Sequence, residues 1–304
     1  MDEKSIPSHD VIGFVNLFKP AGPSSAQCGG ALRKIYRDAG FETPGRRLAA
    51  GHLGTLDPPA AGVLPIALGR ATRLIPLIAD RRKTYAFTLV LGHATSTGDA
   101  TGEVTATAPV PAGARSKLEA TFGEFIGRIA QTPPMHSALK VDGRRLYRLA
   151  RGGVTVERKP RAVTVYALTV LGEDDSATLR LRVSCGEGTY VRTLAEDLAA
   201  SIGTVGHVGA LLREASGPFV LSESRMLEDI QRDPASALIS PEHVIPLPTI
   251  VLDPRGATEF LAGRVVALRE PVGGPYVFVR DPARTLVGVG EMLGAMLAPR
   301  KVFV

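Results

Sequence analysis

The chain has 304 residues, enough to bury a sizeable core and to form two domains. Hydrophobic residues make up 44% and charged residues 22%, and no apolar run approaches the roughly 20 residues that span a bilayer. Met1–Lys4 carries acidic residues and leads into no apolar segment, which argues against a secretory signal. We therefore expect a soluble cytoplasmic protein with no membrane partner.

The formal net charge of +6 is concentrated in one window, Met135–Arg161. Its two acidic residues stand against eight basic ones: Lys140, Arg144, Arg145, Arg148, Arg151, Arg158, Lys159 and Arg161. Outside this window the numbers of basic and acidic residues are therefore equal. A concentrated basic segment favours a polyanionic partner, most simply nucleic acid phosphate, although most charge runs are only solvated faces.

The first half of the chain alternates strand, helix and loop patterns. Ile12–Gly22 reads as a short strand and a turn, and a helix follows from Ser24 or Ser25 and closes at Gly40. The stretch Gly51–Pro65 shows little periodicity of either kind. Thr84–Leu91 has a strand pattern that is apolar on both faces, and Gly92–Gly102 reads as a polar loop.

Further along, capping-box signatures predict two helices. Ser116–Glu119 begins the first, and Thr193–Glu196 begins the second, which runs to about Ile202. The prolines of Gln131–His136 interrupt regular structure ahead of the basic window. Thr178–Ser184 alternates apolar and polar residues and predicts a half-exposed strand.

The sequence pattern changes around Pro246–Pro254, where the predicted elements become short. A short helix (Arg255–Ala262) and short strands (Tyr276–Arg280, Leu286–Val289 and the tail to Val304) follow, closely punctuated by Gly and Pro. This pattern suits a small β-barrel module. We place the domain boundary near 248, with domains 1–248 and 249–304.

The best candidate for chemistry is Asp57, in the stretch Gly51–Pro65. Pro58 biases Asp57 towards extended backbone angles, and the glycines permit tight turns. The alternative is a plain turn with a capping aspartate. No Gly-rich phosphate loop, Ser nucleophile elbow or metal-type spacing of His and Cys competes with it, and Cys28 and Cys185 lie far apart. A lone aspartate can act as a nucleophile or as a general base.

Several segments together resemble the TruB family of bacterial tRNA pseudouridine synthases. They occur in the family's order: Lys19–Gly22, Gly51–Leu74, Lys83–Tyr85, Gln131–Gly153, Gly188–Leu194 and His207–Arg213. The tail from about 250 resembles a PUA RNA-binding module. The resemblance implies a mixed α+β catalytic domain with a largely antiparallel sheet and a small C-terminal β-barrel, with no cofactor or metal.

The resemblance also implies residue roles. Asp57 matches the essential aspartate, Arg192 the arginine paired with it, and Tyr85 the tyrosine that stacks on the flipped base and takes part in proton removal. Tyr190 and Leu211 match residues that line the uridine pocket. Taken singly, Tyr85 and Leu211 could be ordinary core residues and Arg192 a surface residue. Only the match of all the motifs together makes them candidate site residues.

The RNA-facing roles follow in the same way. His52 matches a histidine that enters the RNA loop where bases have been displaced, although alone it could be a turn histidine. The basic window, about 131–161, matches an insertion that closes on RNA, and we expect Lys140, Arg144 and Arg151 to contact the RNA backbone. The chain departs from the family pattern at Ala61, usually Thr, and at Leu212, commonly Arg.

The implied function is isomerisation of the uridine at position 55 in the TΨC loop of tRNA, by base flipping, in a monomer that needs no protein partner. A guide-RNA-dependent relative and an RNA-binding or tRNA-folding protein with dispensable chemistry remain alternatives. A carboxylate glycosidase is a distant one, because no second carboxylate has a recognisable catalytic spacing. Whether Asp57 adds to C6 of uracil, attacks C1′ or drives glycal formation stays open.

Overall fold

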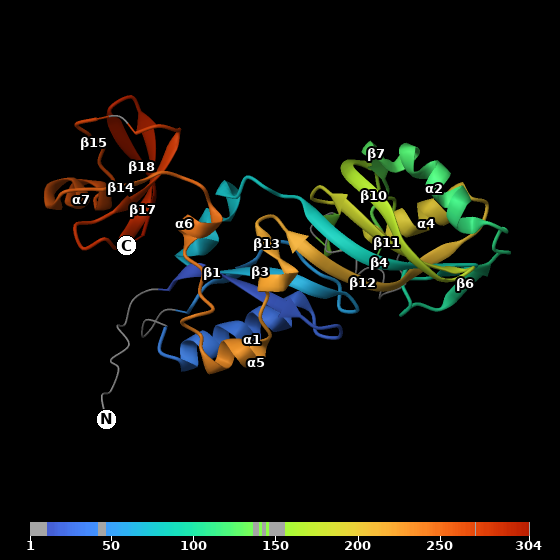
Figure 1. The fold of residues 1–304 in the computed structure, drawn as a ribbon. Helices are drawn as coiled ribbons and strands as arrows, with labels where there is room; N and C mark the ends of the chain where they lie inside the picture. The colour runs from blue at the N-terminus through green and yellow to red at the C-terminus, as the bar shows by residue number, and fades with distance from the viewer. Residues whose placement is uncertain are drawn as a thin grey trace.

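A computed structural model describes residues 11–41, 47–135, 140–141, 144–145, 156–270 and 272–303, the two short pieces by their backbone alone. Two separate β-sheets form the body of the molecule, with the smaller, C-terminal one at one end (Figure 1). None of the helices in these ranges is long and apolar enough to cross a membrane.

The N-terminal prediction is confirmed. The strand β1 spans Ile12–Lys19, and the helix α1 spans Ser25–Asp38. Ser24 caps α1 by accepting a hydrogen bond from the backbone N–H of Gln27, whose side chain returns to the Ser24 backbone. This reciprocal capping satisfies two of the N–H groups that a helix start leaves without partners.

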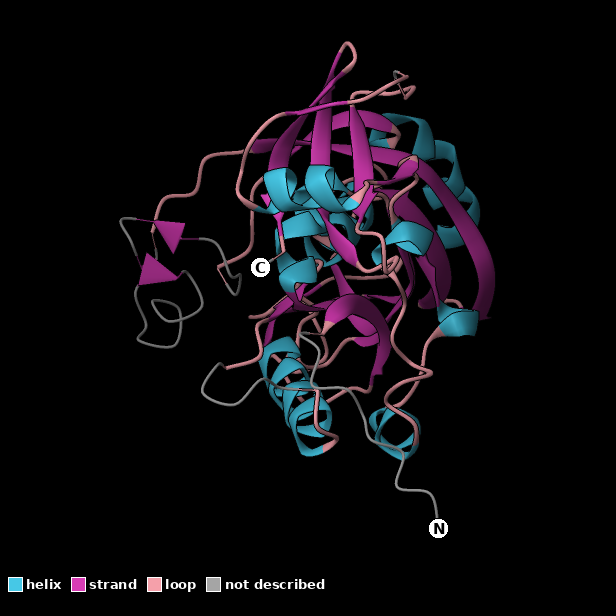
Figure 2. Ribbon diagram, turned by 90° about the vertical axis from the view of Figure 1, so that its left-hand side faces the viewer, coloured by secondary structure: helices cyan, strands magenta, loops and turns pink. Residues whose placement is uncertain are grey.

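The large sheet has nine strands in the order β1-β3-β12-β4-β11-β10-β7, with β2 added to β3 and β13 to β12. The strands are β2 Ala50–His52, β3 Ala61–Gly69, β4 Lys83–Leu91, β7 Gly127–Gln131, β10 Arg161–Asp175, β11 Thr178–Cys185, β12 Gly206–Ser216 and β13 Phe219–Val220. All named pairs are antiparallel except β3–β12. The predicted, largely antiparallel sheet is therefore present, and Figure 2 shows its strong curvature.

Two segments expected to be loops contain strands. Ala61–Pro65 belongs to β3, because the apolar run Val63–Leu68 is buried, between β1 on one side and β2 and β12 on the other. Gly92–Gly102 contains β5 (His93–Thr95), which pairs with β6 (Val104–Thr107). The strand β3 is ordered by pairing with segments distant in sequence, and β5 by a hairpin with the strand that follows it, neither of which local turn chemistry indicates.

The two later helices form, but not through their predicted capping boxes. The helix α2 (Ala114–Phe125) begins after Gly113, two residues before Ser116, and α4 (Val191–Ser201) begins after Tyr190. Neither start has a side-chain cap. Gly113 adopts a left-handed φ of +67°, which glycine allows at little cost, and it sets the start of α2.

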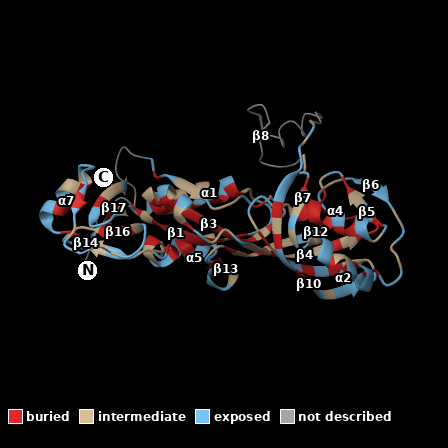
Figure 3. Cartoon of the chain, turned by 90° about the horizontal axis from the view of Figure 1, so that it is seen from above, coloured by how far each residue is buried: buried red, intermediate tan, exposed pale blue. Residues whose placement is uncertain are grey.

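Helices cover the large sheet at both ends (Figure 1). The helices α1 and α5 (Leu227–Arg232) lie together beneath the β1–β3 end, whereas α2 and α4 lie over β10–β12. Buried positions concentrate along the central strands (Figure 3). The remaining short elements are η1 (Arg70–Leu77), β8 (Lys140–Val141), β9 (Arg144–Arg145), η2 (Leu221–Glu223) and α6 (Pro241–Val244).

The C-terminal sheet has five strands in the order β14-β16-β17-β18-β15. They are β14 Thr249–Val251, β15 Val266–Ala267, β16 Tyr276–Arg280, β17 Leu286–Leu293 and β18 Met296–Val302, with α7 (Pro254–Leu261) packed beside them. The predicted helix and all three predicted strand regions are confirmed. Phe278, Val289 and Phe303 of this part share one buried cluster with Phe14 and Val63 of the large sheet.

Candidate functional site

Asp57 lies in the loop between β2 and β3, and its side chain is 37% exposed. The loop is closed by a hydrogen bond from the Ala60 N–H to the Asp57 carbonyl, at 3.1 Å. The Gly22 N–H donates to the Pro58 carbonyl at 2.8 Å and ties the loop to the turn after β1. The carboxylate therefore stands on a segment held at both its own ends and by a neighbouring turn.

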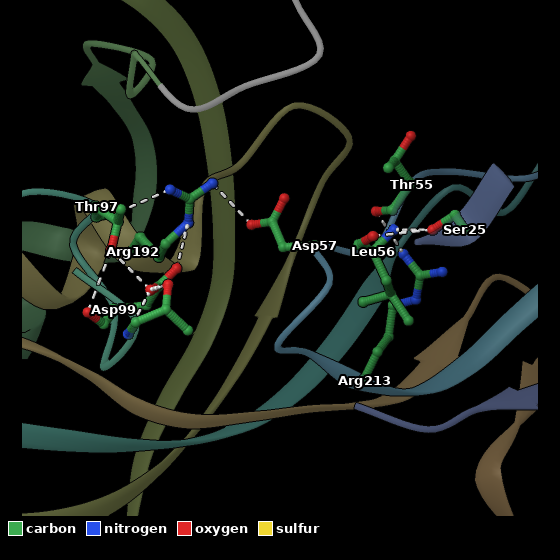
Figure 4. Close-up of polar contacts among 9 residues, drawn as sticks. Ser25, Thr55, Leu56, Asp57, Thr97, Asp99, Arg192 and Arg213 are labelled. Atoms are coloured by element: carbon green, nitrogen blue, oxygen red, sulfur yellow. Dashed lines mark hydrogen bonds and ion pairs between the residues drawn. The ribbon is translucent and has the colours of Figure 1, made fainter. Parts of the chain in front are cut away.

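Two side chains from the start of the chain fix the same loop. The Ser25 hydroxyl accepts from the Leu56 N–H at 2.8 Å and donates to the Leu56 carbonyl at 2.9 Å (Figure 4). Lys19 is fully buried, and its Nζ donates to the carbonyls of Pro58 at 3.1 Å and Ala60 at 2.6 Å. Burial lowers the pKa of Lys19, while the charge of Asp57 opposes that shift.

Arg213 of β12 holds the loop from the other side. It is 0% exposed, and its guanidinium donates to the carbonyls of Val63 at 2.7 Å, Gly54 at 3.0 Å and Thr55 at 3.4 Å. A buried arginine with several carbonyl partners is compensated for lost hydration. The side chain thus spans the loop from its first residues to the start of β3.

Arg192, at the start of α4, forms the ion pair that the resemblance implied. Its Nη2 lies 2.7 Å from Oδ2 of Asp57, and its side chain is only 5% exposed. Its Nη1 donates to the Thr97 carbonyl at 2.8 Å (Figure 4). The guanidinium orients the carboxylate and stabilises its negative charge inside a partly dry site.

A second carboxylate, Asp99, stands behind Arg192 and was missed from sequence. Its Oδ2 lies 3.8 Å from Nε of Arg192, and its side chain is 10% exposed. Its Oδ1 accepts from the Thr97 hydroxyl at 2.7 Å and from the Thr101 N–H at 3.0 Å. The polar Gly92–Gly102 segment was noted for turn chemistry, but nothing local connects it to an arginine some ninety residues later.

These groups surround a cavity of about 210 Å³. Its lining is Thr55, Leu56, Asp57, Lys83, Tyr85, Gly188, Thr189, Tyr190, Val191, Arg192 and Leu211. The structure therefore brings together five of the predicted site residues, from a loop, two strands and the start of a helix. His52 is not among them and lies exposed on β2.

The two tyrosines are held differently. Tyr85 of β4 is 7% exposed, and burial raises its pKa, against the effect of nearby Arg213. The Tyr190 backbone is fixed by buried Gln131, which accepts from its N–H at 3.0 Å and donates to its carbonyl at 3.3 Å. Both tyrosines are thus presented on rigid backbone.

Lys83, two residues before Tyr85 on β4, also lines the cavity. The sequence showed Lys83-Thr84-Tyr85 as part of a matching motif, but nothing in it singled out the ammonium. The three basic residues predicted to contact RNA, Lys140, Arg144 and Arg151, have side chains outside the described part of the chain.

The two departures from the family pattern are neighbours in space. Ala61 of β3 and Leu212 of β12 are register partners in the parallel pairing of those strands. An apolar pair therefore occupies the place where the family commonly has threonine and arginine. Leu211 lines the cavity all the same.

Within the described residues, no group of three or more His, Cys, Asp and Glu side chains could hold a metal ion. The cavity lining offers one half-exposed carboxylate, its buried arginine and two tyrosine rings. Such a site can hold a flat, neutral ring and present a nucleophile to it.

The family match and similar curated relatives indicate the same family. Residues 45–191 match the family described as TruB family pseudouridylate synthase (N terminal domain). The chain is 39% identical over 313 residues to tRNA pseudouridine synthase B of Ralstonia pickettii (strain 12J), covering 97% of this chain and 95% of that protein. It is 37% identical over 298 residues to tRNA pseudouridine synthase B of Trichormus variabilis, covering 96% and 98% respectively.

Two similar solved structures are of multi-component complexes. A Cbf5-Nop10-Gar1 complex contains a chain with TM-score 0.65 and 25% identity, over 96% of this chain and 85% of that one. An H/ACA RNP bound to a substrate RNA containing 2′-deoxyuridine gives TM-score 0.64 and 24% identity, over 96% and 85%. The fold is shared over nearly the whole chain, with lower identity than to the bacterial relatives.

Proposed function

This chain belongs to the TruB family of pseudouridine synthases, and we propose that it isomerises uridine 55 in the TΨC loop of tRNA to pseudouridine. The observation that carries the proposal is the ion pair between Asp57 and Arg192 in a cavity lined by Tyr85, Tyr190 and Leu211. Relatives named tRNA pseudouridine synthase B match over almost the full chain, which supports the same reaction here.

The target nucleotide reaches Asp57 by flipping out of the tRNA loop. An enzyme that acts on a stacked base must extrude it into a pocket. The cavity of about 210 Å³ is smaller than the usual range for ligand pockets, which suits a single nucleoside. Tyr85 and Tyr190 supply aromatic faces, the usual platforms for unstacked RNA bases.

The reaction breaks the C1′–N1 bond and forms a C1′–C5 bond, so atoms are conserved and one proton leaves C5 for solvent while N1 gains one. Asp57 acts as the nucleophile, and Arg192 orients it. The free uracil must turn without escaping, which requires a close-fitting site with little water. We assign Tyr85 to stacking on the base and to removal of the C5 proton, and Leu211 to the pocket wall.

We propose further that the enzyme acts without guide RNA or protein partners. The relatives named tRNA pseudouridine synthase B are 35–44% identical to this chain, whereas the chains from H/ACA assemblies are 24–25% identical. The segment 249–304 would then serve as a PUA-like RNA-binding module, His52 would enter the RNA loop, and the basic window would close on the backbone.

The test is tritium release from 5-tritiated uridine in a TΨC stem-loop transcript, with the purified protein alone. Wild type should turn over, and Asp57→Asn should lose at least about a thousandfold in rate, because losing a nucleophile removes a step rather than weakening a contact. Asp80→Asn, at a half-exposed acid that forms an ion pair with Arg82 and lies outside the cavity lining, is the matched control. Robust turnover by Asp57→Asn would overturn the assignment.

Binding measurements separate the enzyme from an RNA-folding protein with dispensable chemistry. Asp57→Asn should keep its affinity for the stem-loop. Neutralising Lys140 and Arg151 together should lower affinity and flatten its salt dependence. Binding that ignored both salt and these two changes would contradict an RNA-contacting role for the basic window.

A further inference from the structure

Lys83 lines the cavity, and none of the described residues binds its ammonium group. The residue is half-buried and lines the cavity beside Thr55 and Tyr85. Within the described part of the chain its Nζ makes no hydrogen bond or ion pair, and only longer-range charges act on it. A half-buried ammonium loses hydration, so a partner is expected for its three donors.

The backbone around Lys83 is shaped to admit this side chain. A Cβ placed on Gly54 would lie 2.7 Å from Nζ of Lys83, and Gly54 has a φ of +109°. The backbone angle favours glycine at this position, and the space beside it is taken by the flexible end of the Lys83 side chain. The ammonium rests against the first residues of the Asp57 loop, where Arg213 also binds.

The electrostatics of the position favour an anion. Burial lowers the pKa of Lys83, and the nearby charge of Arg213 lowers it further. The acid that most opposes this shift, Glu187, forms its ion pair with Arg81 instead, at 3.4 Å. Two cations thus stand close together, and neither forms an ion pair with a described residue, an arrangement that a bound anion would relieve.

Lys83 stands on the opposite side of Asp57 from Arg192. Figure 4 shows Arg192 on one side of Asp57 and Arg213 with Thr55 on the other, and Lys83 packs at Gly54 beside Arg213. Thr55 is exposed, lines the cavity and has a hydroxyl with no hydrogen-bond partner among the described residues. The cavity lining on this side therefore includes an ammonium and an exposed hydroxyl, and neither has a hydrogen-bond partner among the described residues.

We propose that Lys83 and Thr55 form a phosphate subsite that binds the backbone phosphate of the flipped uridine. The inference rests on the proposed function and adds a residue that grips the substrate outside the base. While the C1′–N1 bond is broken, only the sugar-phosphate keeps the ribose in the site. A phosphate bound by Lys83 and Thr55 would keep C1′ next to Asp57 while the uracil turns.

A phosphate fits this position better than a uracil carbonyl. The ammonium is a compact point charge, the kind of group that binds phosphate, and the cavity lining also includes the exposed Thr55. A phosphate brings a negative charge to the Lys83–Arg213 pair, whereas a uracil carbonyl is neutral.

The experiment combines Lys83→Met with a modified stem-loop RNA whose target phosphate, 5′ or 3′, is a neutral methylphosphonate. Lys83→Met should weaken stem-loop binding about tenfold and reduce the slope of log affinity against log salt by about 1, with Lys83→Arg partly restoring both. The methylphosphonate at one of the two positions should weaken wild-type binding similarly and leave Lys83→Met unaffected, since both changes remove the same contact.

Lys117→Met, at an exposed lysine of α2, is the control and should bind like wild type. If wild type is active but Lys83→Met keeps the wild-type affinity and salt slope, the subsite is wrong. If the loss from Lys83→Met adds to the loss from the methylphosphonate at both positions, the subsite is also wrong, because the ammonium then contacts neither phosphate. Absence of Asp57-dependent turnover by wild type would instead reject the proposed function, so the two failures are distinguishable.

Discussion

Asp57 depends on side chains that lie far from it in the sequence. Lys19, Ser25 and Arg213 bind the carbonyls and N–H groups of its loop, and Arg192 binds its carboxylate. Because each of these four side chains comes from a different element, the position of the carboxylate depends on how the elements of the large sheet pack together. Small errors in such a position are costly in catalysis.

Arg213→Lys tests how closely the loop must be held. Lysine keeps the charge but cannot reach three carbonyls with a planar fork. We expect turnover at saturating stem-loop to fall about 100-fold, with substrate affinity changed less than about threefold. Arg182→Lys, at an exposed arginine paired with Glu214, should leave both values unchanged. Unchanged turnover in Arg213→Lys would show that Lys19 and Ser25 are enough to hold the Asp57 loop in place.

Lys83 should also affect stability in a pH-dependent way. Its pKa in the folded protein is lowered from its ordinary value of 10.5 by burial and Arg213, against Glu187 and Cys185, with Arg81 adding a smaller lowering. Below the folded pKa the unfavourable charge is fully present. As pH rises from the folded pKa to 10.5, the unfolded chain binds more protons, so stability rises.

Lys83→Met should therefore raise the melting temperature of the RNA-free protein near neutral pH. The gain over wild type should shrink as pH rises towards 10.5. Thermal unfolding of wild type, Lys83→Met and Lys117→Met across that range measures it. A lower melting temperature for Lys83→Met at neutral pH would mean that the lysine stabilises the fold rather than serving the substrate.

At the level of elements, the contact between β3 and β12 decides where the loop and Arg213 meet. These strands pair in parallel for two residues only, with Gly62 opposite Arg213. Gly62 has a φ of +111°, and a Cβ there would lie 2.2 Å from the Arg213 carbonyl oxygen. The close approach of these backbones requires glycine.

Gly62→Ala should consequently lower the free energy of unfolding by about 2–4 kcal/mol and reduce turnover, since it moves Arg213 away from the loop. Gly29→Ala is the matched control, because Gly29 lies inside α1 with nothing within 4 Å of its added Cβ. That change should stabilise the protein by about 0.5–1 kcal/mol. Urea unfolding of both variants measures the difference, and equal stabilities would contradict the argument.

At the level of the molecule, the C-terminal sheet is joined to the large sheet by apolar packing. One buried cluster contains Phe14, Val63 and Leu74 from one part and Phe278 and Val289 from the other. Arg73 also donates to the Val302 carbonyl at 2.7 Å. The predicted division at 248 stays a prediction about domain organisation, and this packing favours cooperative unfolding across it.

Phe278→Ala should lower the free energy of unfolding by about 3–5 kcal/mol, as for a large buried aromatic. Amide hydrogen exchange should show β1 and β17 losing protection together. Val251→Ala, at a half-exposed residue of β14, should change stability by less than about 0.5 kcal/mol. Loss of protection in β17 alone would show that the C-terminal sheet unfolds independently.

Sequence patterns predicted elements best where the signal is local. The strand β16 was predicted with its bounds, and the start of α1 was predicted to within one residue. The long strands β10 and β12 went unpredicted, since register shifts interrupt their alternation of polar and apolar residues. The starts of α2 and α4 were misplaced because a Ser or Thr followed three residues later by Glu also occurs inside helices, as it does at Ser116 and Thr193.

The sequence by itself determined the family, the local elements and the candidate aspartate, because motifs and caps depend on neighbouring residues. The resemblance implied that Arg192 pairs with Asp57, whereas only the tertiary structure decided that the two lie 2.7 Å apart, that Asp99 stands behind the arginine, and that Lys83 lines the cavity with no hydrogen-bond partner among the described residues. Strand order and register bring these side chains together from distant parts of the chain. Local patterns do not encode that pairing, because one residue of slip changes which side chains share a face.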